Sequence, residues 1–217
     1  MKIYAINGSP RKNNNTATLL KKALEGVKES VKDTEVETEI INLYDLKYTG
    51  CKSCFACKRI GSKSYGKCAV KDDIHEVLEK ISQADGLIFG SPVYFSNISG
   101  QLQSFCERLL FPYLVYDKNH SSIAPKKIPT AFIYTMNIPE EFMKKSGYIS
   151  TFNNIESAIG LIFTKTLVMY SNNTYQFDDY SKYKSDAFSE EEKAEHRKMQ
   201  FPLDCQKAFE LGASLIK

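Results

Sequence analysis

The feature that most constrains the fold is a polar loop, residues 7–16, with the sequence Asn-Gly-Ser-Pro-Arg-Lys-Asn-Asn-Asn-Thr. An apolar strand pattern over residues 2–6 precedes it, and apolar residues at helical spacing follow it from Leu20 to Val31. The sequence therefore predicts a strand, a loop and a helix in direct succession. Such a loop presents free backbone N–H groups and the positive end of the helix dipole, which together bind anions.

The side chains of this loop favour a phosphate ligand. Ser9, Asn15 and Thr16 supply neutral donors, and Arg11 supplies a cation suited to phosphate. The loop lacks the Gly-Lys-Ser/Thr ending of a P-loop, and Gly8 is its only glycine where the dinucleotide fingerprint has three. Its hydroxyl and amide groups suit a mononucleotide monophosphate bound without a metal. The alternative is a polar turn that binds nothing, but the length and donor density of the loop favour binding.

A second informative loop, residues 91–100, follows the apolar run 86–90, which is typical of a central parallel strand. Ligands of such sheets bind beyond the carboxyl ends of the strands. The loop combines aromatic side chains with hydroxyl groups and an amide, as the flat ring and polar edge of an isoalloxazine require. The alternative for Tyr94 and Phe95 is a place in the core or in a subunit contact.

Both loops resemble those of a known family. Gly8-Ser9-Pro10-Arg11 followed by Asn15-Thr16 is similar to the FMN-phosphate loop of the NADPH-dependent FMN reductase group of the flavodoxin-like superfamily. Ser91-Pro92-Val93-Tyr94, with Ser99 at the start of the next predicted helix, resembles the Ser/Thr-Pro-Val-Tyr loop of that group. The resemblance covers residues 1 to about 112. Asn14 stands where the group often has glycine, and asparagine tolerates a positive φ better than most residues.

The resemblance implies an FMN site. The phosphate would be held by Ser9, Arg11, Asn15 and Thr16, and the ring would be packed and oriented by Pro92, Val93, Tyr94, Phe95 and Asn97. A third loop of the group also helps to hold the flavin; the corresponding residues 135–139 lack its glycine but offer backbone contacts. Because the flavin carries the chemistry, no protein acid or base need be essential, and no catalytic residue is predicted.

Alternating strand and helix patterns predict an α/β fold. Strands are expected at residues 2–6, 36–43, 86–90, 128–136 and 166–170, with amphipathic helices between them. This alternation fits a flavodoxin-like doubly wound five-stranded parallel sheet, order 2-1-3-4-5, with helices on both faces and FMN at the switch point. We expect residues 1–217 to form a single domain.

The C-terminal part of the chain is less regular. Ser189 and Glu192 form a capping box for a charged helix, which Pro202 is expected to break before a last, half-buried helix. The polar insertion 171–184, rich in tyrosine and aspartate, predicts a lid or a subunit contact.

Four cysteines lie close together in the irregular segment 44–71. Cys51, Cys54 and Cys57 are separated by two residues each, and Cys68 follows after ten more. Three interpretations stay open: a [4Fe–4S] cluster, a tetrahedral Zn²⁺ site, or free or redox-active thiols, which we expect. The arrangement resembles iron–sulfur flavoproteins, in which the last cysteine lies closer than here. Because a strand leads into this segment, the cysteines are expected within reach of the flavin or of a neighbouring subunit.

Charge and composition indicate the setting. The net charge is +3 and the basic residues are scattered, which gives no indication of nucleic acid binding. No apolar run reaches about 20 residues and the N-terminus does not resemble a signal peptide, so we expect a cytoplasmic protein without a membrane partner. The aromatic residues of 111–116 and 170–183 predict a homodimer or homotetramer that helps to enclose the flavin.

These features predict an FMN-dependent oxidoreductase that takes a hydride from NAD(P)H and passes electrons to a small acceptor, such as a flavin or a quinone. The first alternative is a non-enzymatic electron carrier of the flavodoxin or iron–sulfur flavoprotein type. Flavodoxins tend to be acidic, whereas this chain is slightly basic, which favours the enzyme. The second alternative is an interaction protein stabilised by a flavin or a metal, without turnover.

Overall fold

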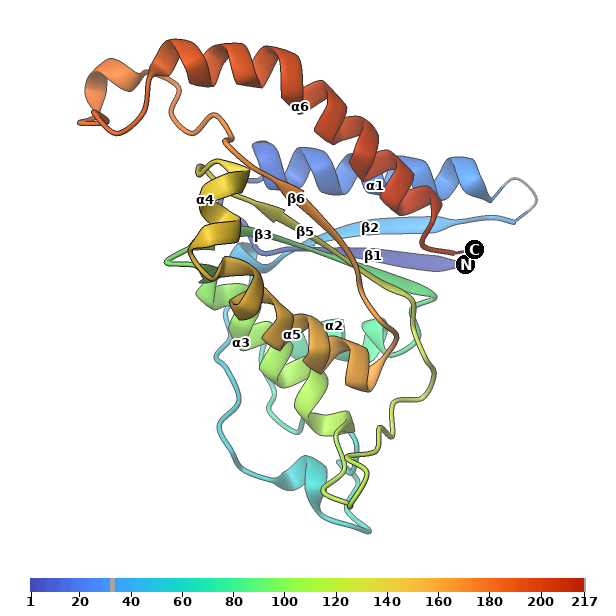
Figure 1. The fold of residues 1–217 in the computed structure, drawn as a ribbon. Helices are drawn as coiled ribbons and strands as arrows, with labels where there is room; N and C mark the ends of the chain where they lie inside the picture. The colour runs from blue at the N-terminus through green and yellow to red at the C-terminus, as the bar shows by residue number, and fades with distance from the viewer. Residues whose placement is uncertain (32–33, 217) are drawn as a thin grey trace.

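Five parallel strands form the centre of the computed structural model, which describes residues 1–31 and 34–216 (Figure 1). They are β1 (Lys2–Asn7), β2 (Glu37–Asn42), β3 (Gly86–Tyr94), β5 (Thr130–Thr135) and β6 (Leu167–Ser171). Their order is β2-β1-β3-β5-β6, and the short strand β4 (Asn97–Ile98) pairs antiparallel with the end of β3. Counted without β4, the parallel strands follow the predicted order, and the flavodoxin-like α/β fold is confirmed.

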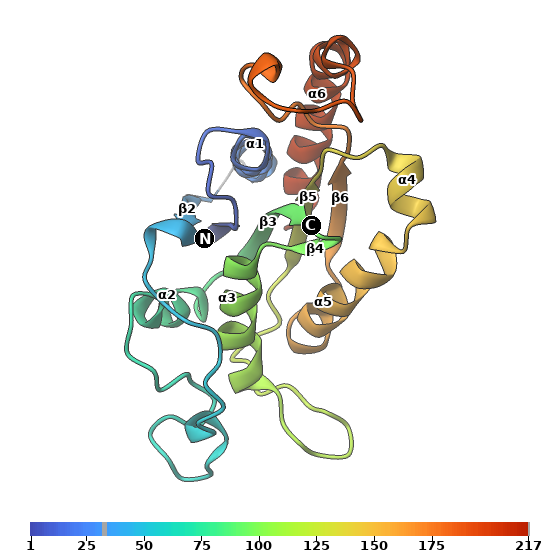
Figure 2. The same ribbon diagram turned by 90° about the vertical axis from the view of Figure 1, so that its left-hand side faces the viewer.

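Helices cover both faces of the sheet (Figures 1 and 2). On one face lie α1 (Asn15–Ser30) and α6 (Glu190–Ala213), and on the other α2 (Ile74–Ile81), α3 (Gly100–Leu110) and α5 (Tyr148–Ile162). Consecutive strand residues point to opposite faces. Ala5 and Ile88 therefore pack with the α1–α6 layer, whereas Ile6 and Phe89 pack with the α2–α3–α5 layer. Burial on both faces explains the nearly continuous apolar sequence of the central strands.

None of the helices within residues 1–31 and 34–216 has both the length and the apolar character needed to cross a bilayer.

The predicted break at Pro202 is wrong, because α6 continues through this residue from Glu190 to Ala213. A proline inside a helix costs about 3 kcal/mol, since it removes one hydrogen bond and crowds the preceding turn. Packing on both sides offsets this cost: Phe201 precedes the proline, and Ala208 follows it, on the buried side of α6. The helix start is as predicted, since the Ser189 side chain accepts the N–H of Glu192 at 3.2 Å.

Two short elements carry no periodic pattern in the sequence. The helix α4 (Glu140–Lys145) has six residues and β4 has two, which is too few to show a repeat.

Two irregular segments lie together beside the C-terminal end of α3 (Figure 1). One is the cysteine loop, residues 50–71, which contains the single helical turn Ala56–Lys58. The other is the α3–β5 segment, residues 111–127. Lys58 joins them, because its Nζ donates to the carbonyl oxygens of Phe111 and Leu114 and lies 4.3 Å from the centre of the Phe111 ring.

The helices α1 and α6 touch through glycine. A Cβ atom on Gly26 would lie 1.9 Å from the carbonyl oxygen of Phe209, and one on Gly212 would lie 1.8 Å from that of Ala23. No side chain fits at either position, so the two backbones approach directly. This contact fixes the path of α6 and thereby places its N-terminal half beside the loop after β1.

We expect Gly212→Ala to lower the free energy of unfolding by about 3 kcal/mol, because the added methyl group forces the two helices apart. Gly160→Ala in α5 is the matched control, since its Cβ would meet only the Lys165 Cα, at 3.8 Å. That variant should be neutral or more stable than wild type by about 0.5–1 kcal/mol. Urea unfolding measures both, and equal stabilities of the two variants would contradict the backbone contact.

Candidate functional site

The loops that follow β1, β3 and β5 meet at the carboxyl ends of these strands and line one pocket, the strand-end pocket. It contains seven of the nine predicted FMN residues: Ser9, Arg11, Asn15, Thr16, Pro92, Val93 and Tyr94. Thr135, Met136 and Asn137 line it after β5, within the third loop that the sequence indicated. The β6–α6 loop, residues 172–189, adds Thr174 and Gln176.

The loop after β1 is held tightly at Gly8. Its N–H donates to the carbonyl oxygen of Gly90 at 2.8 Å, and its carbonyl oxygen accepts from the Ser99 hydroxyl at 2.7 Å. A Cβ on Gly8 would lie only 2.9 Å from the Cβ of Leu102, so a glycine is required at this close approach. Ser99 also caps α3, as predicted, because its side chain accepts the N–H of Leu102. The first and second predicted loops are thereby locked side by side.

The N-terminus of α1 is open to an anion. Asn14 precedes the helix without a side-chain capping bond, and the first turn of α1 carries no acidic residue. The free N–H groups and the helix dipole therefore lack compensation from these side chains. Asn14 itself has a φ of −97°, so it does not use the positive φ that its place in the motif suggests. This is the position at which the sequence predicts the phosphate.

The β6–α6 loop lies over part of this predicted phosphate position. Arg11 Nη1 donates to the carbonyl oxygen of Gln176 at 2.6 Å, and Asn15 Nδ2 donates to that of Tyr175 at 2.9 Å. Thr16 does not contact this loop through its hydroxyl. Its Oγ1 instead shares a hydrogen bond of 2.7 Å with Thr135 Oγ1, which joins α1 to β5. Two of the predicted phosphate ligands thus hold the insertion in place, which supports its interpretation as a lid.

Phe95 and Asn97 are the two predicted FMN residues that do not line the pocket. They belong to a tight hairpin in which Tyr94 pairs with Asn97, and Phe95 and Ser96 form the turn with φ values of 48° and 63°. Positive φ at both turn residues is the I′ geometry, which strains residues other than glycine and asparagine. The Phe95 side chain is fully exposed, so within one protomer it does not pack on a ligand in the pocket.

Two cationic side chains of α6, Lys193 and Arg197, hydrogen-bond to residues that line the pocket. Lys193 is only 2% exposed, and its Nζ donates to the backbone and side-chain oxygens of Asn137 and to Asn173 Oδ1. Arg197, one turn later, donates to Asn15 Oδ1 and lies 3.6 Å from the centre of the Phe201 ring. Burial lowers the pKa of Lys193 to about 8 and also lowers the pKa of Arg197. Neither role could be predicted from the sequence, because Lys193 and Arg197 are two of many charged residues on this helix.

The four clustered cysteines line a second, smaller cavity, the cysteine pocket. Cys54 is exposed, Cys57 is buried, and burial raises the pKa of the Cys57 thiol. Within the described part of the chain, no three His, Cys, Asp or Glu side chains are arranged to hold a metal ion. The predicted ligands are therefore gathered around one cavity without forming a ready-made metal site.

The strand-end pocket and the cysteine pocket lie at opposite ends of α3. Ser99, before the helix, contacts Gly8, whereas Glu107 and Arg108 near its end line the cysteine pocket. An 11-residue helix spans about 16 Å, so the cysteines do not reach the strand-end pocket of their own chain. The cysteines thus lie away from the predicted flavin pocket of their own chain, and their location near a neighbouring subunit stays a prediction.

Arg108 fastens both ends of the cysteine loop to α3. Its guanidinium, 1% exposed, donates to both carboxylate oxygens of Asp72 at 2.8 and 3.0 Å and to the carbonyl oxygens of Thr49 and Val70. Its Nε donates to Cys68 Sγ at 2.9 Å. The hydrogen bond and charge of Arg108 lower the pKa of the Asp72 carboxyl. Asp72 thus serves an ion pair, beyond the helix-capping role that its sequence position indicates.

A protein-family model described as NADPH-dependent FMN reductase matches residues 1–127. An iron-sulfur flavoprotein of Methanocaldococcus jannaschii is 42% identical over 108 residues, which are 50% of this chain and 51% of that protein. The chain spans about half the length of the curated relatives it matches.

Solved structures share the whole fold at low identity. An NAD(P)H:quinone oxidoreductase from Methanothermobacter marburgensis has a TM-score of 0.71 at 15% identity, covering 99% of this chain and 98% of its own. An FMN-dependent NADH-azoreductase from Bacillus anthracis, solved with FMN, has a TM-score of 0.67 at 12% identity, covering 100% of both chains. At these identities the likeness establishes the fold alone.

Asp72→Asn should lower the free energy of unfolding at pH 7 by about 3 kcal/mol, because it leaves the Arg108 charge buried without its partner. The Asp72 pKa lies below its usual 3.8, so its contribution is complete above pH 5 and is lost as the pH falls through the lowered value. The difference from wild type in urea unfolding should therefore shrink towards pH 2. Glu140→Gln breaks the exposed pair with Lys144 and should cost less than about 0.5 kcal/mol. Equal losses in both variants would disprove the special role of Asp72.

Proposed function

The chain belongs to the NADPH-dependent FMN reductase family, and on this premise we propose that it is an FMN-dependent oxidoreductase. It would take a hydride from NAD(P)H and pass electrons to a small acceptor. One observation carries the proposal: two motifs about 80 residues apart converge, with the loop after β5, on a single pocket at the carboxyl ends of the central strands.

The pocket residues suit the parts of FMN. The phosphate would bind at the N-terminus of α1 to Ser9, Arg11, Asn15 and Thr16, with Arg197 behind Asn15 adding positive charge. The ring would pack against Pro92, Val93 and Tyr94, and Asn137, fixed by Lys193, would face its polar edge. Flavin supplies the hydride and electron transfer chemistry.

No catalytic acid or base is proposed. Among the residues that line the pocket, the ionisable side chains are Arg11 and Tyr94. Burial raises the pKa of Tyr94 above its usual value of 10.0, so this hydroxyl stays protonated near neutral pH. The chain's own contribution is to bind, orient and cover the flavin.

Arg11→Ala should weaken FMN binding by about 1.5–3 kcal/mol, the range for a hydrogen bond to a charged group, and should barely change the affinity for riboflavin. Lys12→Ala is the control, because this neighbouring cation pairs with Asp45 and does not line the pocket. Titration of the apoprotein with each flavin gives the affinities. An equal loss for FMN and riboflavin would refute the phosphate assignment.

The FMN-loaded protein should consume NAD(P)H steadily when free flavin or a quinone is present as acceptor. An electron carrier would not oxidise NAD(P)H under these conditions unless a separate reductase were added. Absorbance of the nicotinamide distinguishes the two classes, and the absence of NAD(P)H consumption by the FMN-loaded protein would refute the enzyme.

A second candidate, an electron carrier of the iron–sulfur flavoprotein type, is favoured by the cysteine pocket. Four thiols around one cavity are the donor set of a [4Fe–4S] cluster or of Zn²⁺, and relatives such as that of M. jannaschii are named iron-sulfur flavoproteins. Cys51, Cys54, Cys57 and Cys68 would hold the cluster, with the Arg108 N–H bonded to the Cys68 sulfur.

An assay of iron and acid-labile sulfide in the anaerobically purified protein distinguishes a cluster from free thiols. We keep free or redox-active thiols as our proposal, because ten residues separate Cys57 from Cys68, more than in the iron–sulfur flavoproteins that this segment resembles. About four irons per chain would overturn it. Cys68→Ser should leave the FMN content unchanged in either case, because the two pockets share no residue.

We further propose a single-domain, cytoplasmic protein that forms a homodimer or homotetramer, with no nucleic acid or membrane partner. The six unpaired cysteines suit a reducing compartment. The exposed Phe95 at the hairpin tip and the exposed Tyr116 suit contacts between subunits. A monomer in light scattering at micromolar concentration, still holding FMN, would refute the oligomer.

A further inference from the structure

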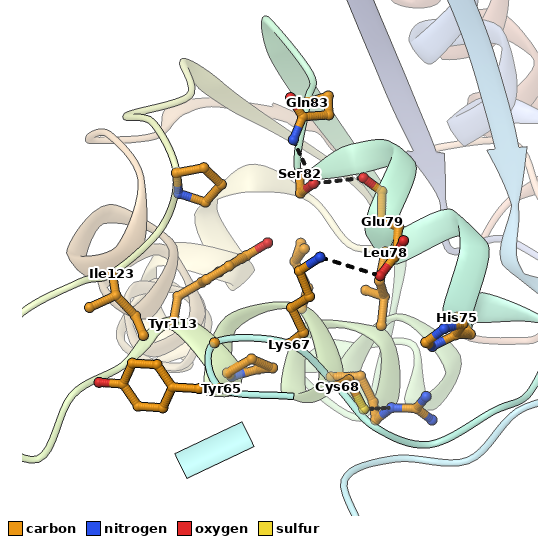
Figure 3. Close-up of a pocket in the computed structure, with 15 residues that line it drawn as sticks. Tyr65, Lys67, Cys68, His75, Leu78, Glu79, Ser82, Gln83, Tyr113 and Ile123 are labelled. Carbon is orange, nitrogen blue, oxygen red and sulfur yellow. Dashed lines mark hydrogen bonds and ion pairs between the residues drawn. The ribbon is translucent and has the colours of Figure 1, made fainter. Parts of the chain in front are cut away.

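A cavity of about 470 Å³ lies between α2, the C-terminal half of α3, the cysteine loop and the α3–β5 segment (Figure 3). This α2–α3 cavity has the size of a small-molecule site. It shares no lining residue with the strand-end pocket. Neither flavin binding nor the cysteine motif accounts for it.

One side of the cavity is lined by aromatic and aliphatic side chains. Figure 3 shows Tyr65, Tyr113 and Ile123 together on this side, facing α2 with Leu78 across the opening. Tyr113 and Leu78 are buried, whereas Tyr65 is 41% exposed and borders the entrance. Aromatic and aliphatic side chains of this kind pack favourably on a flat aromatic ring.

The polar groups of the cavity supply hydrogen-bond donors without excess charge. The Lys67 ammonium stands between the two walls, 3.7 Å from Glu79 Oε1 (Figure 3). At the end of α2, Gln83 Nε2 donates to the Ser82 hydroxyl at 3.2 Å. The Lys67 and Glu79 charges offset each other, and the Arg108 charge is taken up by Asp72. An uncharged ligand with carbonyl oxygens matches this environment better than an anion or a cation.

The cavity also touches the cysteines. Cys68 and Arg108 line both the α2–α3 cavity and the cysteine pocket. The Arg108 Nε donates to the Cys68 sulfur at 2.9 Å and so fixes it where the two spaces adjoin. A molecule in the cavity would therefore lie near Cys68, whereas the other three cysteines line only the cysteine pocket of these two spaces.

We propose that the α2–α3 cavity binds a flat, uncharged aromatic molecule with carbonyl oxygens, of the quinone class, against Cys68. The inference rests on the proposed function only in taking this molecule as an electron acceptor. In that reaction, one NAD(P)H and one proton would reduce one quinone to one hydroquinone, and NAD(P)⁺ would be released. The binding site itself is a property of the cavity.

The first test is equilibrium dialysis of the oxidised, FMN-loaded protein with duroquinone, whose ring carbons are all substituted and add thiols slowly. We expect saturable binding that excess riboflavin does not displace. Tyr65→Ala should weaken binding at least fivefold, while Tyr116→Ala, an exposed aromatic outside the cavity, should not change it. Displacement by riboflavin, equal affinities of the two variants, or the absence of saturable binding would each overturn the proposal.

The second test needs no variant. The FMN-loaded protein, treated with a chelator to remove iron, is alkylated with iodoacetamide and analysed by mass spectrometry. Duroquinone should slow the alkylation of Cys68 severalfold and leave Cys54 unchanged, because Cys54 lies outside the cavity. Protection of both cysteines, or of neither, would overturn the proposal. NAD(P)H consumption with riboflavin as acceptor is measured in parallel, so failure of this site and failure of the proposed oxidoreductase function remain distinguishable.

Discussion

The close approach of the chain at Gly8 to β3 and α3 is the constraint on which the rest of the site depends. Parallel pairing of β1 with β3 brings their carboxyl ends together, but hydrogen bonds from Gly8 to Gly90 and from Ser99 to Gly8 join the loops themselves. The same two bonds orient the starts of α1 and α3. One contact, possible only for a residue without a side chain, therefore sets the anion site, the second loop and the direction of the helix that leads to the cysteines.

The helix α3 connects two chemically different ends of the molecule. Its cap residue, Ser99, bonds to Gly8 beside the strand-end pocket, where hydroxyls, amides and backbone N–H groups gather. Its last residues, Glu107 and Arg108, bind the Cys51 N–H and the Cys68 sulfur. Because α3 is packed along its length by Leu102, Phe105 and Leu109, the two ends are held at a fixed separation. Communication between them within one chain thus depends on this rigid element, and closer contact requires another subunit.

The sequence predicts what is local or periodic. Alternating apolar runs are sufficient for the parallel sheet and its order, and the two loop motifs are sufficient for seven of the residues in the strand-end pocket. The error at Pro202 arises because distant residues decide: burial of Phe201 and Ala208 against the rest of the fold carries α6 through the proline. The outward direction of Phe95 has a local cause, the positive φ of Phe95 and Ser96, which no residue type at this turn indicates. Lys193 and Arg108 carry no local signal at all, since their roles are set by loops far away in the chain.

Because Arg108 holds both ends of the cysteine loop, the number of residues between them can change at little cost. Arg108 holds Thr49 at one end and Val70 and Asp72 at the other, so the chain between these points is a closed loop on a fixed base. Lengthening such a loop costs little, about 0.6 kcal/mol for each doubling. Residues can therefore be gained or lost between Cys57 and Cys68 without disturbing the sheet. The position of Cys68 along the loop is therefore set by the Arg108 anchor and not by the number of residues that precede it.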